Sequence, residues 1–213
     1  MSLHQHTANW QAPTDDKTKA GYGKFLRPKT PYDIYMEEQE IPIYREIGVR
    51  RVQDLPRKPA YLLGAGAAHW HRQISSMPDL TVTAATESGQ RAFAMAGLGP
   101  KDVDVLELYD AFTINTLLFL EDLGFCRKGE GGAFVSKGRI APGGELPVNT
   151  NGGGLSCVHP GMYGIFLLVE AVRQLRGEAG ARQVQDAQVA LAHGNGGVLS
   201  SQITALLGTE ATL

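Results

Sequence analysis

Apolar residues recur with a strand-like spacing in several stretches from residue 59 onward. The clearest is Asp102–Leu108, where acidic and apolar residues alternate, the period-2 pattern of a half-buried strand. Shorter apolar runs at Pro59–Gly66, Gln188–Ala192 and Val198–Leu207 predict further strands. Leu146 and Val148 suit one more short strand.

Three other stretches carry apolar residues at helical spacing. They are Thr83–Leu98, which glycines and Pro100 end, Ala111–Leu123, and Ile165–Leu175. Between the last two, Phe125–Gly144 is rich in glycine and charge, and we expect a long hairpin-like excursion there. Helices alternating with strands on this scale predict an α/β fold built in layers.

The N-terminal stretch has a different composition. Residues 1–58 are polar, poor in aliphatic side chains and interrupted by glycine and proline, with one short helix expected at Tyr32–Glu40. Such a segment cannot build its own core. We therefore predict an irregular segment over 1–58 and one domain over 59–213.

Charge and composition exclude several classes of protein. The net charge of −2 in 213 residues comes without a basic stripe, which argues against nucleic-acid binding. No apolar run reaches the ~20 residues of a membrane helix, and no signal sequence is visible, so we expect a cytoplasmic protein. Cys126 and Cys157 have no metal-ligand spacing, and no metal site is predicted.

The most informative stretch is Val148–Gly164, VNTNGGGLSCVHPGMYG. Three consecutive glycines, Gly152–Gly154, allow a positive φ and a close approach of the backbone to a ligand. His159 would then stand just ahead of a helix, because Pro160 suits a first-turn position. Free backbone N–H groups at such a helix start can meet negative charge.

This stretch resembles the His-Pro-Gly segment of the thiolase superfamily, in particular its sterol-carrier-protein/lipid-transfer-protein branch. Two further motifs agree in order. LYDAFT, with Tyr109, resembles the family's Asn-Glu-Ala-Phe box, and HGNGG, from His193, stands where the family has Cys-x-Gly. The resemblance runs from about Pro59 to Gly208 and implies the C-terminal half of a thiolase fold, an α-β-α arrangement with a mixed central sheet.

The resemblance also implies roles for residues. His159 matches the histidine that activates the family's nucleophile, His193 takes the place of the acid/base cysteine, and Tyr109 that of an oxyanion-hole or water-holding group. The nucleophile itself belongs to the family's N-terminal half and has no counterpart here. Cys157, two residues before His159, is poorly spaced to replace it, and a small buried apolar role is the alternative.

The remaining candidates are side chains that can act as general acids or bases: His159, His193, Tyr109 and Tyr163. One branch of these relatives cleaves β-hydroxyacyl-CoA steroid side chains as an aldolase, uses tyrosines near these two boxes and pairs with an OB-fold partner. A retro-aldol reaction needs a base and donors for an enolate but no covalent acyl-enzyme. For each tyrosine, a hydrogen-bonded core aromatic is the alternative interpretation.

We therefore expect a protein acting on acyl-CoA, making or breaking a carbon–carbon bond near the thioester, either as an acetyl-CoA acetyltransferase or as a retro-aldolase. Asn195, Gly196 and Gly153 are the expected substrate-binding residues, and coenzyme A enters as part of the substrate, with no tightly bound cofactor. A homodimer, or a complex with an N-terminal thiolase half or an OB-fold protein, is expected. The alternative is a non-catalytic subunit or fragment that supplies half a pocket and dimer surface.

Overall fold

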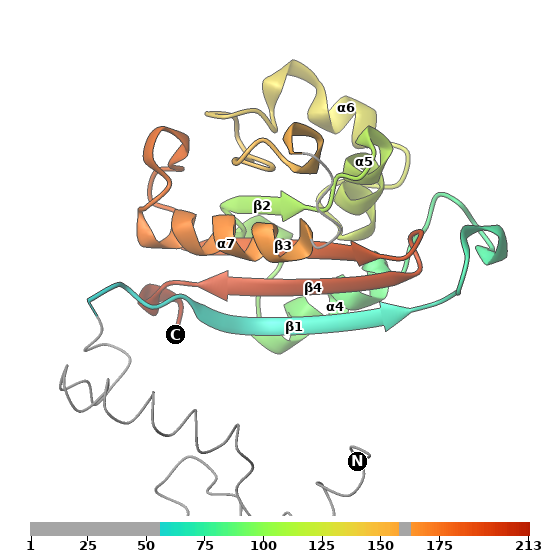
Figure 1. The fold of residues 1–213 in the computed structure, drawn as a ribbon, viewed down its shortest axis with the longest axis horizontal. Coiled ribbons are helices and arrows are strands. Elements are labelled where there is room, and N and C mark those ends of the chain that lie inside the picture. Colours follow the sequence, from blue (N-terminus) through green and yellow to red (C-terminus); the bar gives the residue numbers. More distant parts are fainter. Residues whose placement is uncertain (1–55, 158–162) are drawn as a thin grey trace, which may run out of the picture. The chain divides into compact units, whose positions relative to one another are not determined.

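A computed structural model describes residues 56–157 and 163–213. Its centre is a four-stranded sheet in the order β1-β4-β3-β2 (Figure 1). The strands are β1 (Tyr61–His69), β2 (Val105–Leu108), β3 (Val189–Gly196) and β4 (Ser201–Gly208). β4 is antiparallel to both its neighbours, whereas β2 and β3 run parallel, so the sheet is mixed as predicted.

One face of the sheet is covered by helix α4 (Ala85–Ala96), which packs on β1 and β4. The approach is close because β1 presents glycines to it: a Cβ on Gly64 would lie 2.2 Å from the Ala92 carbonyl oxygen, and one on Gly66 2.2 Å from that of Ser88. Helix α5 (Thr113–Asp122) contributes Phe119, whose ring packs on His193 of β3 on the same side.

The other face is covered by helix α7 (Tyr163–Arg176), which packs on β3 and β2 (Figure 1). Its buried positions, among them Leu167, Ala171 and Leu175, recur at helical spacing against the sheet. Helices therefore flank the sheet on both sides, which confirms the predicted layered α/β fold.

Most predicted elements exist, with ends shifted by a few residues. The hairpin-like excursion at Phe125–Gly144 is wrong: the stretch forms the short helix α6 (Gly131–Val135) and a 3₁₀ turn at Ser136–Gly138. Local polar contacts hold it, since the Gly131 N–H donates to Glu121 and Arg139 pairs with Glu145.

Two strand predictions also need correction. The strand expected at Leu146 and Val148 is reduced to a single bridge between Val148 and Leu106. β3 continues beyond Ala192 to Gly196, because pairing with β4 extends from His193 to the end of the strand. The turn between β3 and β4 therefore starts after the predicted histidine.

Residues 1–55 lie outside the described residues. They include most of the N-terminal segment predicted over 1–58 and its helix at Tyr32–Glu40. Its boundary with the domain stays a prediction. In the described part of the chain, no helix has the length and apolar character needed to cross a membrane.

Candidate functional site

The parallel pairing of β2 and β3 brings the carboxyl ends of both strands to one edge of the sheet. Ligands of α/β proteins commonly bind at such an edge. A pocket of about 340 Å³ lies there, where the two strand ends meet the start of α7. It is lined by Tyr109, Gly164, Ile165, Gly194, Asn195, Gly196, Ser201 and Ile203.

Tyr109 follows β2 directly and is a pocket-lining residue that the sequence predicted as functional. Its ring meets that of Tyr163 edge-on, with centroids 5.5 Å apart. Burial and the nearby negative charge of Asp110 raise the pKa of the Tyr109 hydroxyl. At neutral pH the phenol therefore keeps its proton and can donate it.

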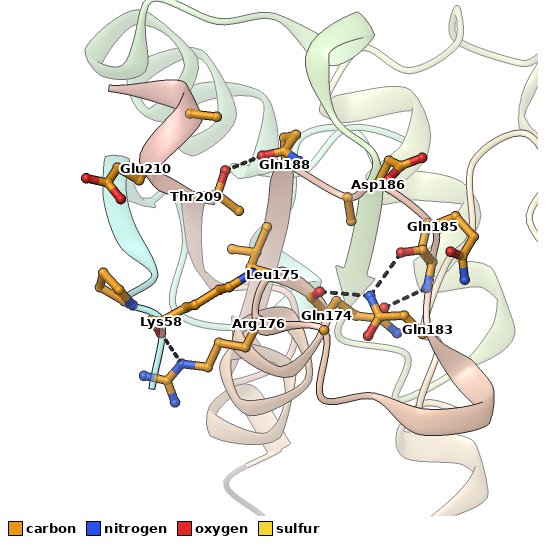
Figure 2. A pocket seen from close by; sticks show the side chains of 15 residues that line it. Lys58, Gln174, Leu175, Arg176, Gln183, Gln185, Asp186, Gln188, Thr209 and Glu210 are labelled. Atoms are coloured by element: carbon orange, nitrogen blue, oxygen red, sulfur yellow. Dashed lines mark hydrogen bonds between the residues drawn. The ribbon is translucent and has the colours of Figure 1, made fainter. Parts of the chain in front are cut away.

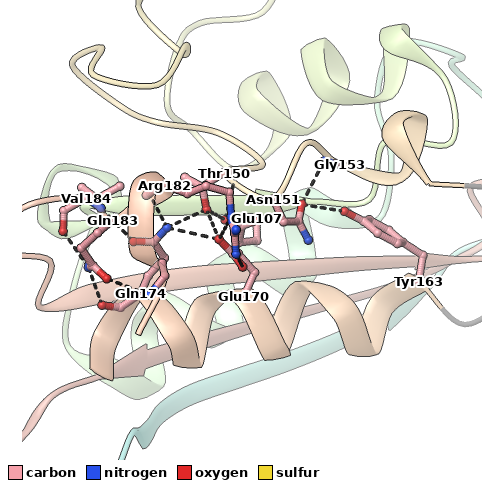
Figure 3. A network of polar contacts seen from close by, with 11 residues as sticks. Glu107, Thr150, Asn151, Gly153, Tyr163, Glu170, Gln174, Arg182, Gln183 and Val184 are labelled. Atoms are coloured by element: carbon pink, nitrogen blue, oxygen red, sulfur yellow. Dashed lines mark hydrogen bonds and ion pairs between the residues drawn. The ribbon is translucent and has the colours of Figure 1, made fainter. Parts of the chain in front are cut away.

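Tyr163 is the first residue of α7, two residues before the predicted start of this helix at Ile165, and only 1% of it is exposed. It lies behind Tyr109, and its hydroxyl donates to Asn151 Oδ1 at 3.2 Å (Figure 3). Burial raises the pKa of Tyr163 as well. The side chain therefore supports Tyr109 from the core and does not itself line the pocket.

Gly153 occupies a backbone conformation that only glycine adopts readily, with φ 72° and ψ 178°. A Cβ there would lie 2.1 Å from Asp110 Oδ2. Asp110 can approach this closely because it accepts the Gly154 N–H at 2.5 Å. The Gly154 N–H thus joins the glycine turn to the residue after Tyr109, and Gly153 leaves room for Asp110. The predicted contact of Gly153 with substrate stays a prediction.

His193 lies beneath the pocket, not on its wall. Its ring is fully buried, and both nitrogens are hydrogen-bonded at 2.9 Å, Nδ1 with Thr204 Oγ1 and Nε2 with Gln202 Oε1. Because Gln202 Nε2 donates to the Leu199 carbonyl, its Oε1 faces the histidine, and Nε2 of His193 carries the proton. Burial lowers the pKa of His193 to about 4, so the ring is neutral.

Asn195 and Gly196, both predicted to bind substrate, line the pocket at the end of β3. Gln202 Nε2 donates to Asn195 Oδ1 at 3.1 Å and so fixes the orientation of the side-chain amide. A planar amide held by its oxygen presents its NH₂ group on the other side. His193, Gln202, Thr204 and Asn195 form one connected group, the His193 cluster.

Sequence reasoning missed Gln202 and Thr204, although a signal was present. They are alternate residues of the predicted strand over 198–207, so they share one face. Polar side chains at this spacing inside an apolar strand indicate a buried partner on the neighbouring strand.

Of the other sequence candidates, His159 lies outside the described residues. Cys157 is a free, exposed cysteine, not the small buried group of the alternative interpretation. No three metal-ligating side chains come together anywhere in 56–157 and 163–213.

A second pocket, of about 510 Å³, lies at the opposite edge of the sheet, between the end of α7 and the end of β4 (Figure 2). Its polar groups bond one another: Arg176 donates to the Lys58 carbonyl, and Gln183 to that of Gln174. None of the predicted site residues lines it, so the pocket beside Tyr109 is the better candidate.

Known proteins resemble this chain over the same region. An acetyl-CoA acetyltransferase from Methanothermobacter thermautotrophicus is 40% identical over 168 residues, covering 78% of this chain and 40% of the relative. Sterol carrier protein 2 of Rattus norvegicus is 48% identical over 111 residues, covering 52% of this chain and 20% of the relative. The chain thus spans less than half the length of these relatives.

Among solved structures, the Ltp2-ChsH2(DUF35) aldolase superposes with a TM-score of 0.66 at 34% identity, covering 76% of this chain and 42% of that one. Residues 66–209 match the family of thiolase C-terminal domain-like proteins. The match includes every described element from α4 to β4, together with the pocket and both tyrosines. The chain therefore belongs to the thiolase C-terminal domain-like family, in its sterol-carrier-protein/lipid-transfer-protein branch.

Proposed function

We propose that the pocket beside Tyr109 binds the thioester end of an acyl-CoA and that the assembled protein cleaves a carbon–carbon bond next to it by a retro-aldol reaction. The observation that carries this proposal is the joint placement of Tyr109 and Asn195 on one pocket wall. Both are neutral hydrogen-bond donors, the groups needed where a thioester becomes an enolate.

In this reaction a base removes the proton of the β-hydroxyl group. The O–H electrons form a carbonyl, the bond between Cα and Cβ breaks, and its electrons pass to the thioester as an enolate, which is then protonated at Cα. We assign the base to His159 on its motif, and stabilisation of the enolate oxygen to Tyr109 and Asn195. Tyr163 and His193 act behind them as positioning residues.

The state of position 193 favours this reaction over carbon–carbon bond exchange through an acyl-enzyme. The resemblance places a cysteine there, but this chain has a neutral histidine engaged on both nitrogens. The solved aldolase with a TM-score of 0.66 supports the same choice.

We further propose that a second polypeptide, or a second copy of this chain, completes the pocket. Ile165 and Ile203 line it but are 54% and 53% exposed. Phe166 and Val169 extend this apolar surface along the outer side of α7. An apolar surface of this kind at a pocket mouth is typical of an interface.

The test is to incubate the full chain, with whatever co-purifies, with β-hydroxyacyl-CoA and separately with β-ketoacyl-CoA plus free CoA. Retro-aldol cleavage yields a shorter acyl-CoA and a carbonyl compound without consuming a thiol, whereas thiolysis consumes one CoA thiol per turnover. Mass spectrometry and thiol titration distinguish them. Turnover of neither ester by the assembled protein contradicts the proposal and leaves a non-catalytic subunit that completes a partner's pocket.

Tyr109→Phe removes the donor and should lower kcat about 100-fold or more, the scale of losing one oxyanion donor. Tyr61→Phe is the matched control, because Tyr61 begins β1 at the far end of the sheet. Equal activity of both variants contradicts the role of Tyr109.

A further inference from the structure

A buried carboxyl group that the reaction above does not use lies between β2 and α7. Glu107 is fully buried, and its side chain faces Thr150 and, beyond it, Glu170 of α7 (Figure 3). Together with Gln174 and Arg182 these residues form the Glu107 network.

The protons around Thr150 can be counted. Its Oγ1 lies 2.8 Å from Glu107 Oε1 and 2.8 Å from Glu170 Oε1, and it accepts a hydrogen bond from Gln174 Nε2 at 2.9 Å. A hydroxyl group has one proton, so it can donate to only one of the carboxyl groups. The other short O···O contact needs a proton from the carboxyl side.

The partners of the two carboxyl groups decide which one carries it. Arg182 donates to both oxygens of Glu170, at 3.2 and 3.0 Å. Burial raises the pKa of Glu170, but hydrogen bonds from Arg182, Thr150 and Gln174 outweigh it, and the net shift is downward. Glu170 is therefore the ionised member.

Among the described residues no cation forms an ion pair with Glu107, since Arg182 pairs with Glu170, and the Oε2 atom of Glu107 is buried without a hydrogen-bond partner. An unpartnered oxygen costs far less on a neutral acid than on a carboxylate. Burial raises the pKa of Glu107 to about 8; the Thr150 hydrogen bonds oppose this, and the negative charges of Glu170 and Asp110 add to it.

We propose that Glu107 is a neutral carboxylic acid at pH 7 and a positioning residue, which donates its proton to Thr150 Oγ1 and so fixes the loop that carries Asn151. This inference rests on the proposed function of the pocket. The hydroxyl of Thr150 then donates to Glu170, and every short contact of Thr150 Oγ1 has its proton.

The loop connects Glu107 to the pocket. Thr150 precedes Asn151, whose Oδ1 accepts both the Tyr163 hydroxyl and the Gly153 N–H. Tyr163 in turn supports the ring of Tyr109. Ionised Glu107 would compete with Glu170 for the one proton of Thr150 and loosen this loop.

Infrared spectroscopy of the full chain tests the protonation state without any need for activity. At pH 7 the wild-type protein should show the carbonyl absorption of a protonated carboxyl group, and Glu107→Gln should lack it. Glu145→Gln, which removes an exposed carboxylate, is the control and should leave it unchanged. Absence of the band in the wild type, or its persistence in Glu107→Gln, overturns the proposal.

Stability gives a second readout. The pKa of Glu107 is raised from 4.5 to about 8 in the folded protein, so its contribution is complete below 4.5 and is lost as pH rises toward 8. The urea midpoint of the wild type should fall between pH 6.5 and 8, and in Glu107→Gln this fall should disappear. A fall of the same size in Glu107→Gln contradicts the proposal.

The positioning role has its own readout in the assembled, active protein. The wild-type kcat should fall as pH approaches 8, and Glu107→Gln should lose this limb, since its amide can still donate to Thr150. Glu107→Ala should lower kcat about tenfold relative to Glu107→Gln. Equal kcat and equal pH profiles in the wild type, Glu107→Gln and Glu107→Ala contradict the positioning role. If none of the three turns over acyl-CoA, the proposed function is contradicted, and the infrared test still decides the protonation state of Glu107.

Discussion

Two buried polar groups hold the pocket from opposite faces of the sheet, and they differ in charge. The Glu107 network lies under α7 and includes an ion pair between Glu170 and Arg182. The His193 cluster lies on the side of α4 and α5, and all its members are neutral, because the pKa of His193 is lowered. The Glu107 network fixes the loop behind Tyr163, and the His193 cluster fixes the side chain of Asn195.

Their responses to pH have opposite signs. The folded pKa of His193, about 4, lies below its ordinary 6.5, so its contribution is present above pH 6.5 and is lost as pH falls toward 4. That of Glu107 is lost as pH rises from 4.5 toward 8. Between about pH 4.5 and 6.5 the two groups change the free energy of unfolding in opposite directions. The wild-type protein therefore shows neither pH dependence in this range.

The largest expected effect on stability comes from removing the histidine of the His193 cluster, the neutral one of the two groups. His193→Ala leaves a cavity next to Phe119 and removes one hydrogen-bond partner each from Gln202 and Thr204. We expect a loss of about 3–5 kcal/mol in the free energy of unfolding, measured by urea denaturation. A loss below about 1 kcal/mol would mean that water or a rearranged Gln202 replaces the ring, and that the cluster does not hold Asn195.

The next largest effect on stability is expected at Gly153, in the loop that the Glu107 network holds. Gly153→Ala forces a side chain into a backbone conformation reserved for glycine and against Asp110, and should cost about 2–4 kcal/mol. Gly132→Ala is the matched control, because a Cβ there has no atom within 4 Å. Equal urea midpoints for the two variants would show that the turn is free to move away from Asp110.

Substitutions that remove one of the two titrating groups should reveal the pH dependence of stability that the other group contributes. In Glu107→Gln, stability should rise with pH between about 5 and 6.5, by up to about 1.4 kcal/mol per pH unit, because the opposing contribution of Glu107 is gone and that of His193 remains. In His193→Gln, stability should fall between 4.5 and 8. Between about pH 5 and 8, the double variant should lack both slopes. Parallel profiles for the two single variants would contradict the assigned charges.

The smallest expected effect concerns a single hydroxyl group. Tyr163→Phe removes the hydrogen bond to Asn151 and should cost about 1 kcal/mol. Tyr61→Phe makes the same chemical change where the hydroxyl is buried without a partner among the described residues, and should be neutral or stabilising. A Tyr163 variant as stable as the Tyr61 variant would show that the loop does not depend on this bond.

The sequence predicted helices α4, α5 and α7 and the four strands of the sheet well, because each depends on local periodicity. It did not reveal that His193 is buried, since this follows from the continued pairing of β3 with β4 beyond Ala192. Nor could alternation at Asp102–Leu108 distinguish a solvent-facing Glu107 from one covered by α7. The pocket joins Tyr109 to Asn195 across 86 positions of the chain, a contact that only tertiary structure shows.

The position of β4 in the sheet has a consequence for how the domain is made. β4 is the final strand in the chain order, yet it lies between β1 and β3 and is the only strand paired with β1 in the described sheet. On the ribosome, β1 therefore waits until some 140 further residues have emerged before it finds its partner. Such non-local pairing slows folding, so a chaperone that shields β1 during synthesis should raise the yield of folded protein more than one acting after release.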